Sequence, residues 1–170
     1  MKVDLPSVKP ESTFESLCKS VGFVTIQWGQ SEQSLELLVN VLFRDYGGSG
    51  LPKRKRMPRP LAEKLSFVKE CASAIPSLAA FRSDLESLVS NFESLIQTRH
   101  GLVHGALANT KAVNGVYSFM RLETHPDIHE VKEFQYDLME FPALADALVR
   151  LGADAPRLAK LVFDARPTQS

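Results

Sequence analysis

The six residues from Arg99 to His104 contain two side chains that together could act on a phosphate group. Arginine presents a planar fork of donors that suits phosphate and the charge that develops on a pentacoordinate phosphorus. Histidine has an ordinary pKa near ~6.5, so it can accept or donate a proton at neutral pH. Because RNA carries its own nucleophile, the 2′-OH, this pair could cleave RNA without a metal ion. The products would be a 2′,3′-cyclic phosphate and a 5′-OH.

Arg99 also stands where a core residue is expected. Steps of three and four residues lead back from it along one apolar helix seam, Leu95, Phe92, Leu88, Leu85, Phe81 and Leu78. A charge on such a seam costs several kcal/mol unless it is paired or solvated. We therefore expect either a cleft at this point or an ion pair with Glu32, the charged residue on the seam of an earlier helix. The ion pair would either orient Arg99 for catalysis or serve structure alone.

The spacing of Arg99 and His104 sets a geometric condition. Residues five apart on an ideal helix point about 140° from each other, by the 3.6-residue period. The two groups would meet if the helix loosens at Gly101, a weak helix former, or if two chains each supply one group. A purely structural interpretation of His104 is a cap at the carboxyl end of its helix.

The four histidines fall into two pairs with a spacing of four residues, His100 with His104 and His125 with His129. The first pair shares a helix face, as two ligands of one metal ion would. The second pair lies beside a proline, in a predicted loop. Because no cysteine or acidic residue stands at a matching position, we expect neither a metal site nor a cofactor.

The helices that must position these residues are marked by apolar periodicity and by glycine and proline. The predicted elements are a helix from Ser12 or Thr13 to Tyr46, a basic loop over 47–60, and helices over Leu61–Ala74 and Pro76–His104. A last helix over Leu138–Phe163 is expected to bend or break at Gly152 and Pro156. The lead-in 1–11 is extended.

The pattern changes to strands over 106–136. Asn114-Gly115 is a strong hairpin signal between predicted strands Ala106–Val113 and Val116–Glu123, and Val131–Tyr136 can add a third. The sequence thus predicts a mainly α fold: an antiparallel helical bundle with a small β-hairpin before the C-terminal helix, in one domain over 1–170.

Composition limits the partners and the compartment. The 170 residues are 44% hydrophobic and carry a formal net charge of zero, so attraction for a polyanion must be local. The first residues lack the apolar run of a signal peptide, and no stretch reaches the ~18 apolar residues of a membrane span. Cys18 and Cys71 lie far apart and are expected to be buried free thiols. A cytoplasmic protein with no membrane contact is predicted.

The only dense basic run is Lys53, Arg54, Lys55, Arg56 and Arg59. It is either a solvated loop or a grip on RNA phosphates that reads no sequence. Trp28, on the seam of the first helix, is interpreted as a core or dimer contact rather than as a platform for stacking a base.

These residues resemble the HEPN (higher eukaryotes and prokaryotes nucleotide-binding) domain family. The segment R-H-G-L-V-H is similar to that family's motif of arginine, a polar residue and a histidine at the end of a bundle helix. Two further segments resemble its first long helix and the helix beside it, FVTIQWGQSEQSLELLVNVLF and PLAEKLSFVKE. Asparagine or aspartate is the more usual neighbour of the arginine, where this chain has His100.

The resemblance implies a helical homodimer whose two motifs face each other. Arg99 and His104 would be catalytic and His100 would be the supporting polar residue. Many family members are metal-independent endoribonucleases, often toxins of toxin–antitoxin pairs or anti-phage components, which implies an RNA substrate and an antitoxin or regulatory protein as partner. Other members cleave nothing. The alternative is therefore an inactive helical dimer that binds a protein or a nucleotide.

Overall fold

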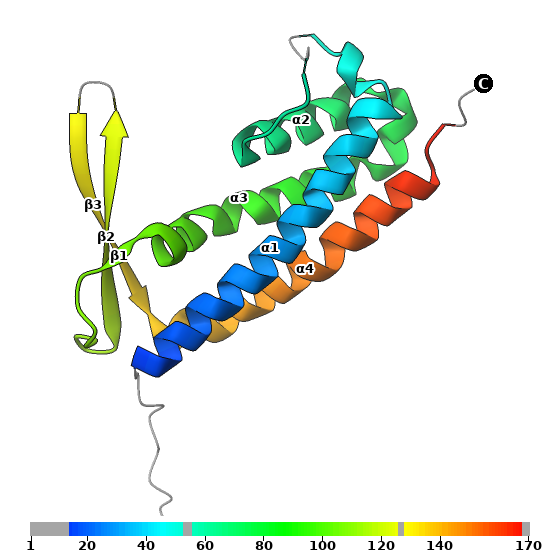
Figure 1. Cartoon of the computed structure of the whole chain (residues 1–170). Coiled ribbons are helices and arrows are strands. Elements are labelled where there is room, and N and C mark those ends of the chain that lie inside the picture. The colour runs from blue at the N-terminus through cyan, green and yellow to red at the C-terminus, as the bar shows by residue number, and fades with distance from the viewer. Residues whose placement is uncertain (1–13, 53–55, 126–127, 168–170) are drawn as a thin grey trace, which may run out of the picture.

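The computed structural model describes residues 14–52, 56–125 and 128–167, with the side chains of 123–129 left out. Four helices dominate it (Figure 1): α1 (Phe14–Arg44), α2 (Leu61–Ala74), α3 (Arg82–His104) and α4 (Phe141–Asp164). Three 3-10 turns are η1 (Gly48–Gly50), η2 (Pro76–Phe81) and η3 (Leu138–Glu140). A small sheet lies between α3 and α4 in the chain, in strands β1 (Ala106–Leu107), β2 (Val116–His125) and β3 (Ile128–Asp137). The mainly α fold class is confirmed.

The helix directions differ from a simple antiparallel bundle. Contacts between α1 and α4 advance together along both helices, from Phe23 against Phe141 to the hydroxyl of Tyr46 on the carbonyl of Val162. The α1–α2 contacts advance in the same way. Helices α1, α2 and α4 therefore share one direction, and α3 alone runs antiparallel to them (Figure 1).

The core joins all four helices to the sheet. The largest fully buried side chains are Trp28, Leu35, Leu38, Leu42, Phe67, Leu78, Leu85, Phe92, Tyr117, Tyr136, Leu148 and Leu151. Burial of each such side chain contributes roughly 1.5–3 kcal/mol relative to exposure. The apolar seams predicted from the sequence are thus the surfaces that pack together.

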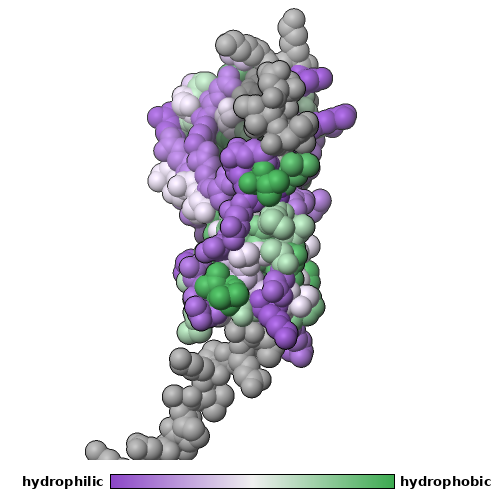
Figure 2. Space-filling model, turned by 90° about the vertical axis from the view of Figure 1, so that its left-hand side faces the viewer, coloured by the Kyte–Doolittle hydropathy of each residue, from purple (hydrophilic) through white to green (hydrophobic). Residues whose placement is uncertain are grey.

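The sheet corrects the predicted strands. Asn114 and Gly115 do form a tight turn with positive φ of 54° and 89°, closed by hydrogen bonds between Val113 and Val116. The strand before this turn is only β1, however, and the long hairpin pairs β2 with β3 in an antiparallel register. The Asn-Gly sequence determines where the tight turn forms. The main partner of β2 is instead set by the alternating apolar residues of β3. The exposed Met120, Leu122 and Val131 lie on the outer face of the sheet. Figure 2 shows the molecule from the side on which the sheet lies.

Two smaller predictions also change. Helix α4 continues through Gly152 and Pro156, because its face from Leu148 to Val162 is buried along its length. At Gly152 a side chain would meet the amide of Gln27 on α1, so the glycine allows close helix packing. Of the two cysteines, Cys71 is buried as expected, whereas Cys18 is exposed.

Candidate functional site

Arg99 lies in the last two turns of α3, and its side chain is half-buried. Its guanidinium carbon stands 5.7 Å from the ring centroid of Trp28 on α1, in cation–π geometry. Trp28 itself is 2% exposed and packs edge-to-face on Phe92, with ring centroids 5.4 Å apart. The prediction that Trp28 belongs to the core is confirmed, and its indole forms the floor under the arginine.

Arg99 and His104 meet within one chain. The Arg99 Nη1 atom lies 2.5 Å from Nε2 of His104, and α3 remains helical from one residue to the other. Neither a loosened helix nor a second chain is needed, because the long arginine side chain spans the offset that the backbone imposes. A guanidinium has only donors, so Nε2 of His104 is the acceptor and its ring proton sits on Nδ1. The exposed His104 therefore points its basic nitrogen at Arg99.

His100 completes the group at the end of α3. Its ring centroid lies 5.6 Å from that of His104, and the two rings are tilted by 56°. Burial lowers the pKa of His100 below its ordinary value, and the positive charges of Arg99 and Arg121 lower it further, against a smaller effect of Glu32. His100 is thus held neutral at neutral pH. Arg121, on β2, is a residue that the sequence did not indicate.

The predicted ion pair between Arg99 and Glu32 is wrong for the described residues. The Glu32 carboxylate instead accepts a hydrogen bond of 3.1 Å from the indole nitrogen of Trp28, one turn earlier on α1. The indole occupies the space between the two charges, so it contacts the carboxylate with its edge and the guanidinium with its face. Trp28 therefore contacts both Glu32 and Arg99, which form no ion pair with each other.

Gly101 has a packing role rather than the hinge role considered from the sequence. A side chain at Gly101 would collide with the ring of Phe134 on β3, and one at Gly105 would press on Phe119 of β2. The two glycines let the sheet lie directly against the last turn of α3. The rings of Phe119 and Phe134 pack beneath it, with their centroids 6.1 Å apart. Close backbone approach is a common reason for glycine in a helix that packs on another element.

A small groove of about 140 Å³ opens beside this contact. From α3 and its end it is lined by Gln97, Gly101 and Gly105, and from the sheet by Phe119, Arg121, Lys132, Glu133 and Phe134. Gln97 and Gly101, which line the groove, each lie three residues before a site histidine, His100 and His104 respectively. Residues three apart are neighbours on a helix surface. The groove therefore runs next to the site histidines.

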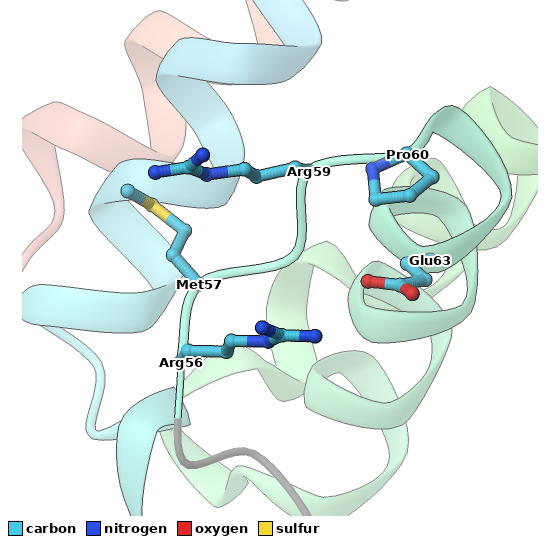
Figure 3. Close-up of a pocket in the computed structure, with 5 residues that line it drawn as sticks. All are labelled: Arg56, Met57, Arg59, Pro60 and Glu63. Carbon is cyan, nitrogen blue, oxygen red and sulfur yellow. The ribbon is translucent and has the colours of Figure 1, made fainter.

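The basic loop forms a separate site. Arg56 and Arg59 line a pocket of about 490 Å³ with Met57, Pro60 and Glu63, at the start of α2 (Figure 3). In Figure 3 the side chain of Arg56 points toward α2, and that of Arg59 points toward α1. The other members of the predicted RNA grip, Lys53, Arg54 and Lys55, lie outside the described residues.

In the part of the chain that the structure describes, no group of three or more His, Cys, Asp or Glu side chains could hold a metal ion. The side chains of His125 and His129 are not among those described. No described helix combines the length and the apolar character needed to cross a membrane. Comparison with protein-family models, with curated proteins and with solved structures gave no match to this chain.

Proposed function

We propose that this chain is a HEPN-type, metal-independent endoribonuclease that acts as a homodimer. The observation that carries the proposal is the contact between Arg99 and His104 at the exposed end of α3. An arginine and a histidine in one site supply the two functions that internal cleavage of RNA requires, charge stabilisation and proton transfer.

The contact suggests how substrate starts the reaction. A phosphate is a stronger partner for a guanidinium than a neutral imidazole is, so the scissile phosphate draws Arg99 away from His104. The Nε2 lone pair of His104 is then free to take the proton of the 2′-OH. The 2′-oxygen forms a bond to phosphorus, and the bond to the 5′-oxygen breaks. Water protonates the leaving oxygen, and His104 returns its proton to the resulting hydroxide. Arg99 stabilises the negative charge that builds up on the phosphorus oxygens.

The surroundings of Arg99 support this role over a purely structural one. Its partners in the described structure are an aromatic face and an imidazole, and neither neutralises its charge. The alternative function, an inactive dimer that binds a protein or a nucleotide, assigned Arg99 to an ion pair with Glu32. That pair does not form, because Glu32 binds the indole of Trp28. The geometry therefore favours the enzyme.

The test is cleavage of labelled single-stranded RNA by the purified chain in EDTA. We expect products with 2′,3′-cyclic phosphate and 5′-OH ends, and we expect Arg99→Ala and His104→Ala each to reduce the rate by about 10²–10³-fold. Circular dichroism would establish that both variants stay folded. Cleavage that survives either substitution, or an absence of cleavage by the unmodified chain, would overturn the assignment.

The dimer is tested separately. Sedimentation would give the mass of the chain in solution, and mixing Arg99→Ala with His104→Ala subunits would show whether one site draws on both chains. Recovery of activity in the mixture means a shared site. Since Arg99 and His104 already meet in one chain, we expect no recovery.

A further inference from the structure

Helix α1 has an outer face that no other element of the described structure covers. The residues of this face follow one another at steps of three and four, the spacing of one stripe along a helix. They are Glu15, Lys19, Gly22, Ile26, Gly29, Gln33, Leu37, Asn40 and Arg44, all exposed except the half-buried Asn40. We call this row the outer stripe of α1. Trp28, which lies under Arg99, is on the opposite, buried side of the helix.

The outer stripe lacks the charges that a solvated helix face usually carries. None of the exposed residues of α1 from Gly22 to Leu37 is charged, although 24% of the chain is. The apolar side chains of Ile26 and Leu37 are 62% and 50% exposed. A side chain at Gly29 would meet nothing within 4 Å, so packing within the described chain gives no reason for this weak helix former. Exposed apolar residues without charge are typical of the centre of a protein interface.

The charges at the two ends of the stripe favour a second copy of α1 as the partner, in antiparallel orientation. The stripe is nearly symmetric about the middle of α1, at Gly29, so its positions fall opposite one another when the helix pairs antiparallel with itself. Glu15 then faces Arg44 of the second copy. Arg44 has no ion pair among the described residues, so its charge is available for this one. Parallel pairing would instead place each charge opposite its own copy, and like charges repel.

The area available matches that of a stable dimer. From Glu15 to Arg44 the stripe is about 44 Å long, at 1.5 Å per residue. A standard interface of about 800 Å² per partner would need a strip about 18 Å wide over that length. Two helices packed side by side provide about this width. Helix α4 lies beside α1 (Figure 1), so the pair of helices presents a surface of the required size.

Helix α4 also continues the apolar surface. A side chain at Gly152 of α4 would meet Gln27 and Ser31, which places Gly152 beside the middle of α1. Val149 and Pro156 are exposed and lie within about one turn of Gly152, so they border α1 on its outer side. The same two-fold axis brings Val149 opposite Pro156 of the second copy. The flank on α4 is thus matched to itself in the same register as the stripe.

We propose that this chain dimerises through the outer stripe of α1, packed antiparallel on the stripe of a second copy, with the two α4 helices at its flank. The inference rests on the homodimer of the proposed function and not on its chemistry. Because Trp28 and Arg99 lie on the opposite side of α1, both Arg99–His104 pairs are outside this interface. The dimer therefore carries two complete and separate sites, unlike the facing motifs that the HEPN resemblance implies.

The first measurement is the dissociation constant of the dimer of the full chain, from sedimentation over a range of concentrations. Leu37→Glu puts a charge into the stripe of each copy, so it should raise the constant by about 10²-fold. Leu161→Glu is the matched control, since Leu161 is a helical leucine that is 42% exposed against 50% for Leu37. Leu161 follows Gly152 by about two and a half turns, which places it on the side of α4 away from α1. This control should leave the constant unchanged.

Charge reversal tests the antiparallel register. Glu15→Arg and Arg44→Glu each bring like charges together at both ends of the interface, so each should weaken the dimer by about 10-fold. The double variant Glu15→Arg/Arg44→Glu restores opposite charges and should recover the original constant to within about 3-fold.

Cross-linking gives an independent distance. The two copies of position 29 meet at the middle of the interface, so Gly29→Cys in a Cys18→Ser background should form disulfide-linked dimers under mild oxidation. Cys18 of the unmodified chain is exposed, but its two copies would lie about 35 Å apart along the helices. The unmodified chain should therefore form no such dimer.

A chain that stays monomeric, or a dimer that Leu37→Glu leaves intact, would overturn the inference. An equal loss with Leu161→Glu, a double reversal without recovery, or cross-linking through Cys18 would do the same. The dissociated Leu37→Glu variant should keep its rate of RNA cleavage per chain, and loss of cleavage on dissociation would contradict the two separate sites. If the dimer behaves as described but RNA is not cleaved, the proposed chemistry fails and the interface stands.

Discussion

The two ends of the molecule differ in whether their buried and half-buried polar groups have partners. At the end where α1 and α4 finish, Lys64 of α2 pairs with Glu36 of α1 at 2.6 Å, and the Tyr46 hydroxyl donates to a backbone carbonyl. At the sheet end, Arg99 has no carboxylate partner among the described residues, and the buried hydroxyl of Tyr136 has no hydrogen-bond partner there either. The buried lysine of the first end is paired, whereas at the sheet end the guanidinium of Arg99 has no carboxylate partner and the hydroxyl of Tyr136 has no hydrogen-bond partner in the described structure.

The contrast is sharpest along α1, where two glutamates one turn apart face two cations. Glu36 neutralises Lys64, whereas Glu32 binds the indole of Trp28 and leaves the charge of Arg99 uncompensated. An anion that displaced Lys64 from Glu36 would have to break an ion pair. An anion that binds Arg99 would displace only the imidazole of His104, and Arg99 would keep its contact with the face of Trp28. Departures from local satisfaction of this kind are expected at functional sites.

The largest expected effect comes from removing each cation with the same substitution. Arg99→Met should lower kcat/KM for RNA cleavage by about 10³-fold, because transition-state charge loses its donor. Lys64→Met should leave cleavage unchanged and lower the free energy of unfolding by about 2 kcal/mol, since Glu36 loses its partner but keeps contact with solvent. Activity assays and urea titrations give both quantities. If Arg99→Met unfolds the chain, or if Lys64→Met abolishes cleavage, the distinction between a cation for activity and a cation for stability is wrong.

The next effect tests how firmly the sheet holds its end of α3. Gly101→Ala should destabilise the fold by about 3 kcal/mol, because the new methyl group would occupy the space of the Phe134 ring. The control is Gly22→Ala on α1, where a side chain would meet nothing within 4 Å. That substitution should raise stability by up to about 1 kcal/mol through helix propensity. Equal effects at the two glycines in thermal melting would show that the sheet is not docked there.

Double-mutant cycles measure the two α1 pairs directly. The cycle of Lys64→Met with Glu36→Gln should give a coupling energy of about 1–2 kcal/mol in unfolding experiments. The cycle of Arg99→Met with Glu32→Gln should give a coupling near zero, because these two groups share no ion pair. A sizeable coupling in the second cycle would mean that Arg99 is held for structure after all.

Two of the buried tyrosines, Tyr46 and Tyr136, offer a smaller test. Tyr46→Phe removes a hydrogen bond of 2.8 Å to the carbonyl of Val162 and should cost about 1 kcal/mol. Tyr136→Phe removes a hydroxyl that has no partner in the described structure, so it should be neutral or stabilising. Burial raises the pKa of Tyr136 to about 12, and its absorbance should therefore titrate later than that of a free tyrosine. A loss of stability on Tyr136→Phe would indicate a partner for that hydroxyl.

The smallest expected effect is the pH dependence that His100 contributes. Its pKa in the folded chain lies below the ordinary value of ~6.5, so the unfolded chain binds the proton first as pH falls. Stability should therefore decline as pH drops through 6.5 and level off below the folded pKa. His100→Gln should flatten this part of the curve in urea titrations between neutral and mildly acidic pH. An unaltered curve would show that His100 is not desolvated.

Apolar periodicity predicted the helices well because their seams are local patterns. Helix α2 begins and ends at the predicted residues, and α3 ends at His104 as expected. The long hairpin was missed because strand pairing is decided at a distance, and the Asn114-Gly115 turn is real but serves a very short strand. The unbroken α4 was missed for a related reason, since its packing on α1 outweighs the breaking tendency of Pro156.

The site was predicted in composition but not in arrangement. The residue types of Arg99 and His104 were evident from the sequence, yet their direct contact depends on side-chain reach, which helix angles do not include. Glu32 was assigned the wrong partner, because the periodicity does not show that Trp28 lies between the charges. Arg121 carried no signal, since its strand had been paired with another segment.

The missing side chain at Gly101 has a practical consequence. Helix α3 and strand β3 meet so closely there that a larger residue at position 101 requires a smaller one at position 134. An alanine there combined with a smaller residue in place of Phe134 forms a bump-and-hole pair, in which each change is harmful alone and tolerated together. Such a pair would vary how closely the sheet packs on α3 while Arg99 and His104 keep their residue types.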